Sequence, residues 1–180
     1  MTRVAVTAFG PDRPGIVAML TGVLLGHGAN LEDTSMTILQ GHFAMMLVAD
    51  LPPGEGPGPL ESTLGREVAG LGLTVVVRPL EGEGHRPAVE EASNWSVSVY
   101  GSDHPGIVHR VTQVLAEADA NITDLTTRVV GEEALPAYVM LLEVSLPPGA
   151  DAGRLGAELA VLGDELGVEV HLRPHDADVL

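Results

Sequence analysis

The sequence of 180 residues contains no cysteine and no lysine, and only five aromatic residues. Without cysteine the chain forms no disulfide and offers no thiolate for catalysis or for metal binding. Because aromatic side chains are so few, aliphatic side chains must build the core. The nine basic residues, all arginine, are scattered among 25 acidic residues. The resulting net charge of −16 argues against direct contact with nucleic acid or with an anionic membrane surface.

Long apolar runs are missing as well. No uncharged apolar stretch is long enough to span a bilayer. The short apolar start of the chain soon meets Gly10-Pro11-Asp12, so we predict no secretory signal and a cytoplasmic location. The apolar fraction of 45% is nevertheless ample for a core, and the length suits one ordinary domain or two small ones.

An internal repeat favours two domains. Residues 10–17 (GPDRPGIV) recur as residues 101–108 (GSDHPGIV), at an offset of 91 that also pairs Asn30 with Asn121. Further along the chain the offset becomes 95, and we expect a hairpin turn near residues 131–134 to absorb the four additional residues. The predicted organisation is a first domain over residues 1–80, a linker over 81–92, a second domain over 93–175 and a tail over 176–180.

Each copy has the pattern β-α-β-β-α-β. In the first copy we expect strands at residues 3–9, 31–39, 43–48 and 73–78, one helix that begins at Pro14, and another over residues 60–71. The second strand is polar on both faces, which is typical of a sheet edge. Gly28 and Asp119 are expected to end the first helix of each copy in the left-handed conformation. The predicted fold class is α+β, with two ferredoxin-like (βαββαβ) sandwiches built on antiparallel sheets.

The turn before the first helix is the leading candidate for a ligand site. With Pro14 at the first helical position, the amides of residues 15–17 are free to bind a carboxylate, and Gly15 lets a ligand approach the backbone. Asp12 adds a carboxylate that a pure anion would avoid and that an ammonium group would pair with. The local chemistry therefore favours a free amino acid over a nucleotide. Asp103 and residues 106–108 repeat this arrangement.

Structural alternatives remain open for these residues. An Asp before Pro-Gly is an ordinary helix start, and Asp12 can simply cap the helix, although capping does not require the same motif twice. Asn30 and Asn121 begin the edge strands, where they either satisfy turn backbone or reach a ligand held by a neighbouring domain. Asp33 and Asp124 are interpreted as solvated charges that discourage aggregation.

Residues 12–17 followed by residues 28–33 (GANLED) resemble the start of an ACT domain, and the second copy matches at residues 103–108 and 120–124. Two such repeats most resemble the glycine cleavage system transcriptional repressor family. The resemblance implies ferredoxin-like modules that pair edge to edge and bind amino acids at the pairing interface. It also implies a repressor that acts through an activator protein rather than through DNA.

The resemblance assigns ligand-binding positions in both copies. They are Asp12, Arg13, Pro14, Gly15, Ile16 and Asn30 in the first copy and Asp103, His104, Gly106, Ile107 and Asn121 in the second. His104 replaces Arg13, and we interpret it as an exposed side chain; the alternative is that it tunes the site or senses pH.

Closely similar turns open formyltetrahydrofolate deformylases and some phosphoserine phosphatases, but those enzymes need a further catalytic domain and the two repeats consume the chain. No nucleophile elbow or P-loop occurs, and the seven histidines lack metal-site spacing. The segment Asp176-Ala177-Asp178 is interpreted as a solvated tail, with His175 its incidental neighbour. We therefore predict no catalytic residue, no metal and no cofactor.

The predicted function is a non-enzymatic sensor of a small amino acid, glycine or serine. The predicted assembly is a homodimer, with pairing of the two domains of one chain as the alternative. The sensor would act on a partner protein in the transcriptional regulation of glycine and one-carbon metabolism. The alternative is a detached regulatory or assembly subunit of an amino-acid or folate enzyme, with no ligand binding of its own.

Overall fold

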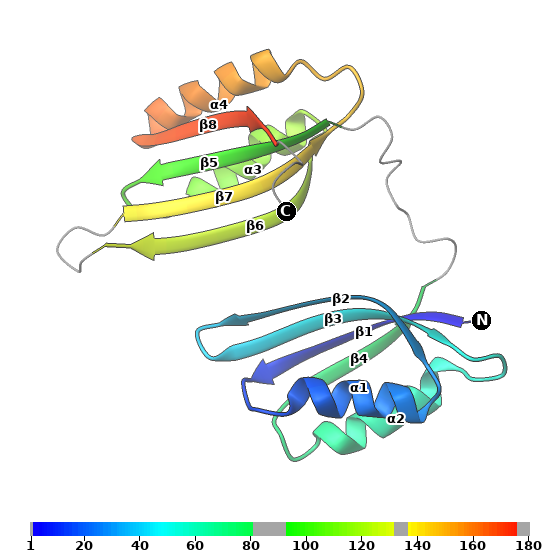
Figure 1. Ribbon diagram of the computed structural model, residues 1–180. Helices are drawn as coiled ribbons and strands as arrows, with labels where there is room; N and C mark the ends of the chain where they lie inside the picture. The colour runs from blue at the N-terminus through cyan, green and yellow to red at the C-terminus, as the bar shows by residue number, and fades with distance from the viewer. Residues whose placement is uncertain (1, 81–92, 132–136, 176–180) are drawn as a thin grey trace. The chain divides into compact units, whose positions relative to one another are not determined.

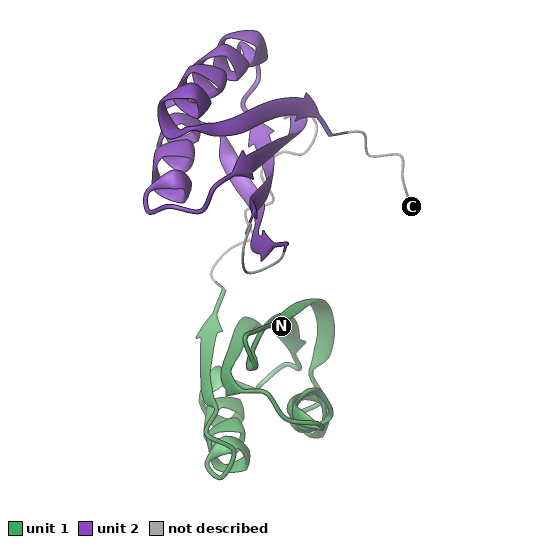
Figure 2. Cartoon of the chain, turned by 90° about the vertical axis from the view of Figure 1, so that its left-hand side faces the viewer, with its two compact units in different colours: residues 1–85 green, residues 86–180 purple. Residues whose placement is uncertain are grey.

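The computed structural model describes residues 2–80, 93–131 and 137–175. The chain divides into two compact units, residues 1–85 and 86–180 (Figure 2). The predicted linker over 81–92 and the predicted tail over 176–180 lie outside the described residues.

The two units contain the same elements in the same order (Figure 1). The first unit consists of β1 (Thr2–Pro11), α1 (Ile16–Gly26), β2 (Asn30–Leu39), β3 (His42–Leu51), α2 (Pro57–Val68) and β4 (Thr74–Pro79). The second unit consists of β5 (Ser93–Gly101), α3 (Ile107–Glu117), β6 (Asn121–Val130), β7 (Ala137–Leu146), α4 (Ala152–Leu166) and β8 (Val168–Pro174). None of these helices is long and apolar enough to cross a membrane.

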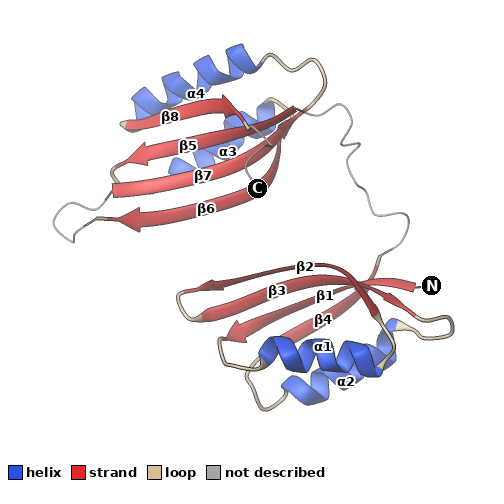
Figure 3. Cartoon of the chain, viewed as in Figure 1, coloured by secondary structure: helices blue, strands red, loops and turns tan. Residues whose placement is uncertain are grey.

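Each unit is a sandwich of one sheet and two helices. The sheets have the orders β2-β3-β1-β4 and β6-β7-β5-β8, and every neighbouring pair of strands is antiparallel. The two helices of a unit cover one face of its sheet and leave the other face open (Figure 3). The predicted α+β, ferredoxin-like fold is therefore confirmed. The predicted edge strand, β2, is exposed along its whole length.

The core of each unit lies between the helices and one face of the sheet. Along β3, alternate residues are buried, and α1 adds Ile16, Leu20 and Leu24 from one helical face. The core is mostly aliphatic, as the composition predicts, and Phe43 and Tyr138 are its buried aromatic side chains.

The first helix of each unit ends as predicted from the sequence. Gly28 and Asp119 both have left-handed backbones, with φ of 65° and 52°. The next amide, of Ala29 in one unit and Ala120 in the other, turns back to a carbonyl in the last turn of the helix at 3.0 Å and 2.9 Å. This ending aims the chain into the edge strand.

The hairpin between the second and third strands explains the change of offset. Gln40 and Gly41 alone join β2 to β3, and both have positive φ, as a tight two-residue hairpin requires. In the second unit β6 ends at Val130 and β7 begins at Ala137, so the connection is longer by four residues. Most of the predicted turn near residues 131–134 lies outside the described residues.

Candidate functional site

The turn before α1 differs in one respect from the sequence prediction. Pro14 does not open the helix. The helix begins at Ile16, and Gly15 is the capping residue, with φ of 92°. The second unit has the same geometry, with Gly106 at φ 104° before Ile107. A left-handed residue before a helix favours glycine, so backbone conformation already requires glycine at both positions.

The predicted free amides are present at this helix start, shifted by one residue. The first helical hydrogen bond runs from the amide of Met19 to the carbonyl of Gly15, at 2.9 Å. The amides of residues 16–18 therefore precede the first helical bond, and no side chain caps this end. In the second unit the corresponding bond runs from Arg110 to Gly106. Both helix starts can accept an anionic group.

In the first unit the turn lines an open hollow of about 460 Å³. The lining residues are Asp12, Arg13, Gly15, Ile16, Val17, Ala18, Met36 and Phe43. The structure thus brings together four of the predicted positions in this copy; Pro14 and Asn30 are not in the lining. The amide of Asp12 donates to the carbonyl of Gly41 at 2.9 Å, which ties the turn to the β2–β3 hairpin.

Several residues of the repeated motif have a structural reason to recur. A Cβ atom at Gly10 would lie 2.7 Å from the carbonyl oxygen of Gly72, and one at Gly101 would lie 2.6 Å from a methyl of Val168. These glycines let the first strand of each unit pass close to the connection that enters its last strand. Ile16 and its counterpart Ile107 are core residues.

The repeated aspartates have no such reason. Asp12 and Asp103 are exposed, and no side chain caps α1 or α3, so the alternative in which Asp12 caps its helix is not what the structure has. Neither carboxylate forms an ion pair with a residue that the structure describes. The fold therefore leaves both carboxylates available for a ligand.

The turn of the second unit is held differently. His104 is not a freely exposed side chain as predicted: its Nε2 lies 2.8 Å from the carbonyl oxygen of Leu166, at the end of α4. Burial and, secondarily, the charge of Asp103 raise the pKa of the Tyr138 hydroxyl. Asp103 follows Gly101 by two residues, and Gly101 pairs with Tyr138, the buried aromatic residue at the position of Phe43.

Asn30 does not meet the turn within its own unit. It begins β2, and Met36, which lines the hollow, lies six residues further along, about 20 Å away at ~3.3 Å per strand residue. Its side-chain amide donates to Glu32, and it lies opposite Asp50, whose carboxylate forms a two-point ion pair with Arg3 at 2.8 and 2.9 Å. Asn121 occupies the same place in the second unit, opposite Ser145.

Aromatic residues also lie beside the turn, although the repeated motif does not include them. Four of the five aromatic residues occupy equivalent positions in the two repeats. Tyr100 corresponds to Phe9, and Tyr138 corresponds to Phe43. In a chain so poor in aromatics, this correspondence was a usable signal. Phe43 and Tyr138 lie beside the candidate site, whereas Phe9 and Tyr100 are 50% and 42% exposed where their strands reach the turn.

Metal chemistry has no support within residues 2–80, 93–131 and 137–175. No group of three His, Asp or Glu side chains there is arranged to hold a metal ion.

Comparison with known proteins identifies the family. The model of the ACT domain matches residues 2–78 and again residues 96–173, so the chain belongs to the ACT domain family, with two such domains in tandem. ACT domains typically bind small ligands such as amino acids.

Three similar proteins illustrate the relation. A UPF0237 protein of Methanopyrus kandleri is 44% identical over 79 residues, which is 43% of this chain and 88% of that protein. The glycine cleavage system transcriptional repressor of Escherichia coli is 28% identical over 166 residues, 91% of this chain and 85% of the repressor. The crystal structure of an unknown protein from Galdieria sulphuraria matches with a TM-score of 0.81 at 27% identity, covering 97% of this chain and 99% of that one.

Proposed function

We propose that this tandem ACT-domain protein is a non-enzymatic regulator that binds a small free amino acid, glycine or serine. The proposed sites are the turns at residues 12–16 and 103–107. On this proposal the protein acts on a partner protein in the transcriptional regulation of glycine and one-carbon metabolism. Similarity to the Escherichia coli repressor over nearly the whole chain supports the regulatory role.

The observation that carries the proposal is the pair of aspartates at the two turns. The glycines of the motif are explained by backbone conformation and close packing, and the isoleucines by burial. Asp12 and Asp103 recur without capping a helix and without an ion pair to a described residue. A ligand explains why both copies keep this carboxylate.

The chemistry of the turn selects a zwitterion. The amides that open α1 and α3 favour a negatively charged group, and charge-assisted hydrogen bonds to such a group are short and strong. The aspartate beside them repels a ligand that is only anionic. An amino acid satisfies both halves, with its carboxylate on the amides and its ammonium group on Asp12 or Asp103. The open hollow beside Asp12 has room for a ligand of this size.

Asn30 can reach a ligand site when two copies of the protein pair. Because β2 is an exposed edge, it can pair with β2 of a second molecule about a two-fold axis. In antiparallel pairing the start of one strand lies beside the end of the other. Asn30 of one copy then comes near the turn of its partner, where its side-chain amide can reach the bound amino acid.

A second candidate function is a detached regulatory or assembly subunit in which the turns are only helix starts. The exposed edge strands β2 and β6 favour it, because they serve assembly whether or not a ligand binds. Direct measurement of amino-acid binding separates the two functions.

The test is calorimetric titration of the full chain with glycine and serine. A charge-assisted hydrogen bond contributes about 1.5–3 kcal/mol. Asp12→Asn and Asp103→Asn should therefore weaken binding at their own sites by roughly tenfold or more. The fold should survive, since neither carboxylate caps its helix. Glycine amide and acetate should both bind more weakly than glycine, because each lacks half of the zwitterion.

Glu67→Gln is the matched control, since Glu67 is an exposed acidic residue of α2 that lies neither in the hollow nor on the edge strand. It should leave the affinity unchanged. Unchanged affinity in both turn variants, or acetate that binds as tightly as glycine, would show that the turns are helix starts only. Absence of any binding would favour the assembly subunit.

A further inference from the structure

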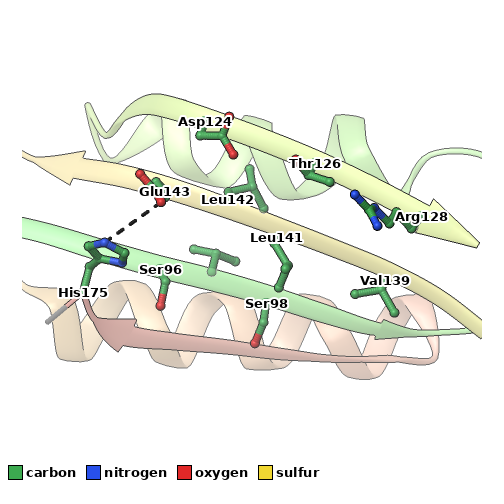
Figure 4. Close-up of a pocket in the computed structure, with 11 residues that line it drawn as sticks. Ser96, Ser98, Asp124, Thr126, Arg128, Val139, Leu141, Leu142, Glu143 and His175 are labelled. Carbon is green, nitrogen blue, oxygen red and sulfur yellow. Dashed lines mark ion pairs between the residues drawn. The ribbon is translucent and has the colours of Figure 1, made fainter. Parts of the chain in front are cut away.

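The open face of the second sheet carries a hollow of about 470 Å³ that is separate from the turns (Figure 4). Strands β5, β6 and β7 form its floor, on the face that α3 and α4 do not cover. Its volume is in the range of small-molecule sites.

Charge is separated along this hollow. Asp124 and Glu143 lie directly opposite each other on β6 and β7 at one end, with the Nε2 of His175 4.0 Å from Glu143. Arg128 lies at the other end, four residues along β6. Between the two ends Thr126 faces Leu141, whose side chain is 47% exposed. The hollow therefore has an acidic end, an apolar middle and a basic end, as Figure 4 shows.

This charge pattern costs stability without a ligand. Like charges directly opposite each other on neighbouring strands are destabilising, and the acidic pair Asp124–Glu143 has only a distant histidine beside it. Arg128 forms no ion pair with any residue of the described segments. A cationic group between the two carboxylates and an anionic group on the guanidinium would remove both costs.

The first unit shows that the fold does not need the paired carboxylates or the arginine. At the equivalent positions it keeps Asp33 for Asp124 but has Val48 for Glu143 and Thr37 for Arg128, and its sheet has the same strand order. The duplication thus serves as an internal comparison, in which the same sheet forms with a single carboxylate at one end and no arginine at the other. The pair of facing carboxylates and the basic end are features of the second unit alone.

We propose that this hollow binds a short extended peptide with free termini, its ammonium group between Asp124 and Glu143 and its carboxylate on Arg128. Four residues of a strand separate the two ends by about 13 Å, and an extended tripeptide spans about 10 Å, a difference that the side chains bridge. A free amino acid carries its two charges one carbon apart and cannot reach both ends. The exposed Leu141 selects an apolar central side chain. This site is independent of the amino-acid turns.

The experiment is an NMR titration of the full chain with the tripeptide Ala-Leu-Ala. The amide signals of residues 96, 98, 126, 128 and 141 should shift, and those of the turns at residues 12–18 and 103–108 should not. Exposed ion pairs contribute up to about 1 kcal/mol, so Arg128→Gln should weaken binding about fivefold. The same variant should not change the affinity for Ala-Leu-Ala amide, which lacks the carboxylate. Glu143→Gln should likewise weaken binding of Ala-Leu-Ala, because it removes a charge beside the ammonium group. It should not change the affinity for the N-acetylated peptide, which lacks that group.

Arg154→Gln is the matched control, because Arg154 lies on α4, on the covered side of the sheet away from the hollow, and loses the same charge. Fluorescence of Trp95, the single tryptophan, which packs against the second core, checks that each variant is folded. Three results would overturn the proposal. They are the absence of shifts in the hollow, equal binding of peptides with free and blocked termini, and shifts that follow protein concentration without peptide, which would make this face a contact between copies.

Discussion

Gly15 and Gly22 are seven residues apart and have different backbone conformations. Gly15 has φ of 92°, a backbone that side-chain-bearing residues adopt only with strain. Gly22 lies inside α1, where its φ is not positive and a Cβ atom would meet nothing within 4 Å. Glycine inside a helix costs more conformational entropy than alanine. One glycine is therefore required by the turn, and the other weakens the helix it belongs to.

We predict opposite effects of alanine at these two positions. Gly22→Ala should stabilise the first unit by about 0.5–1 kcal/mol. Gly15→Ala should destabilise it by about 1–2 kcal/mol, because alanine is strained in the left-handed region. Urea titration of the full chain, followed by amide NMR signals that distinguish the two units, measures both. Equal effects of the two substitutions would contradict the assigned conformation of the turn.

The helices and strands were largely predictable from the sequence, and the start of α1 was not. Periodicity located each element to within a few residues, because one buried face sets a period of two in a strand and 3.6 in a helix. The helix end at Gly28 followed from the residue type. The sequence places the helix start at Pro14, because proline often occupies the first helical position. Here Gly15 lies between Pro14 and the helix instead. Contacts elsewhere in the fold determine this geometry, and no local sequence pattern indicates it.

The candidate site was predictable only in part. The repeat identified residues 12–16, and the structure gathers most of them in one hollow. It did not reveal Met36, which reaches the hollow through the register of β2 on β3, where Met36 lies opposite Met45. Nor did it show that His104 bonds to the end of α4. Both contacts join residues far apart in the chain, so no local pattern encodes them.

The pairing of β1 with β3 places Arg3 opposite Asp50 and gives a pH-dependent contribution to stability. The hydrogen bond from Arg3 holds the pKa of the Asp50 carboxyl below its ordinary value. Because this pKa is lower in the folded state, the contribution is present above the ordinary aspartate pKa of about 4 and is lost as pH falls through the folded value. The second unit has Asn94 and Ser145 at these positions and lacks the effect.

We therefore predict that Arg3→Gln raises the pKa of Asp50 toward its ordinary value, as measured by carboxyl NMR titration. The variant should destabilise the first unit more at about pH 7 than at a pH below the lowered pKa of Asp50, where the carboxyl is protonated in both proteins. Ser35→Ala, a change on the same open face of the sheet away from the ion pair, is the control. If Asp50 titrates normally in the unmodified protein, the ion pair does not persist in solution.

The two units of the whole molecule have kept one fold and diverged at their surfaces. The turn of the first unit lines an open hollow. The turn of the second unit is joined to the end of α4 by the hydrogen bond between His104 and the carbonyl of Leu166. The open sheet face is uncharged at the positions of Val48 and Thr37 and charged at those of Glu143 and Arg128. Duplication supplies two copies of a stable scaffold, so each surface is free to acquire a ligand of its own.

The exposed edge strands lead to a prediction about assembly. Strand β2 presents ten exposed residues, among them Leu31, Met36, Ile38 and Leu39, and its only charged side chains are Glu32 and Asp33 near its start. A long edge with apolar side chains and no lysine or proline is open to pairing with another chain. Strand β6 is similarly exposed. We expect the protein to associate through an edge strand, as a homodimer with a two-fold axis.

Light scattering coupled to gel filtration should then give twice the mass of the chain at micromolar concentration and above. Ile38→Lys places a charge on the edge and should shift the mass toward the monomer. Leu25→Lys is the matched control: Leu25 is 78% exposed on α1, so the same change of an apolar residue to lysine there should leave the mass unaltered. The prediction fails if the unmodified protein has the monomer mass at every concentration, with and without an amino acid. Under that outcome Asn30 could not reach the turn of a second molecule, and the site would have to form without it.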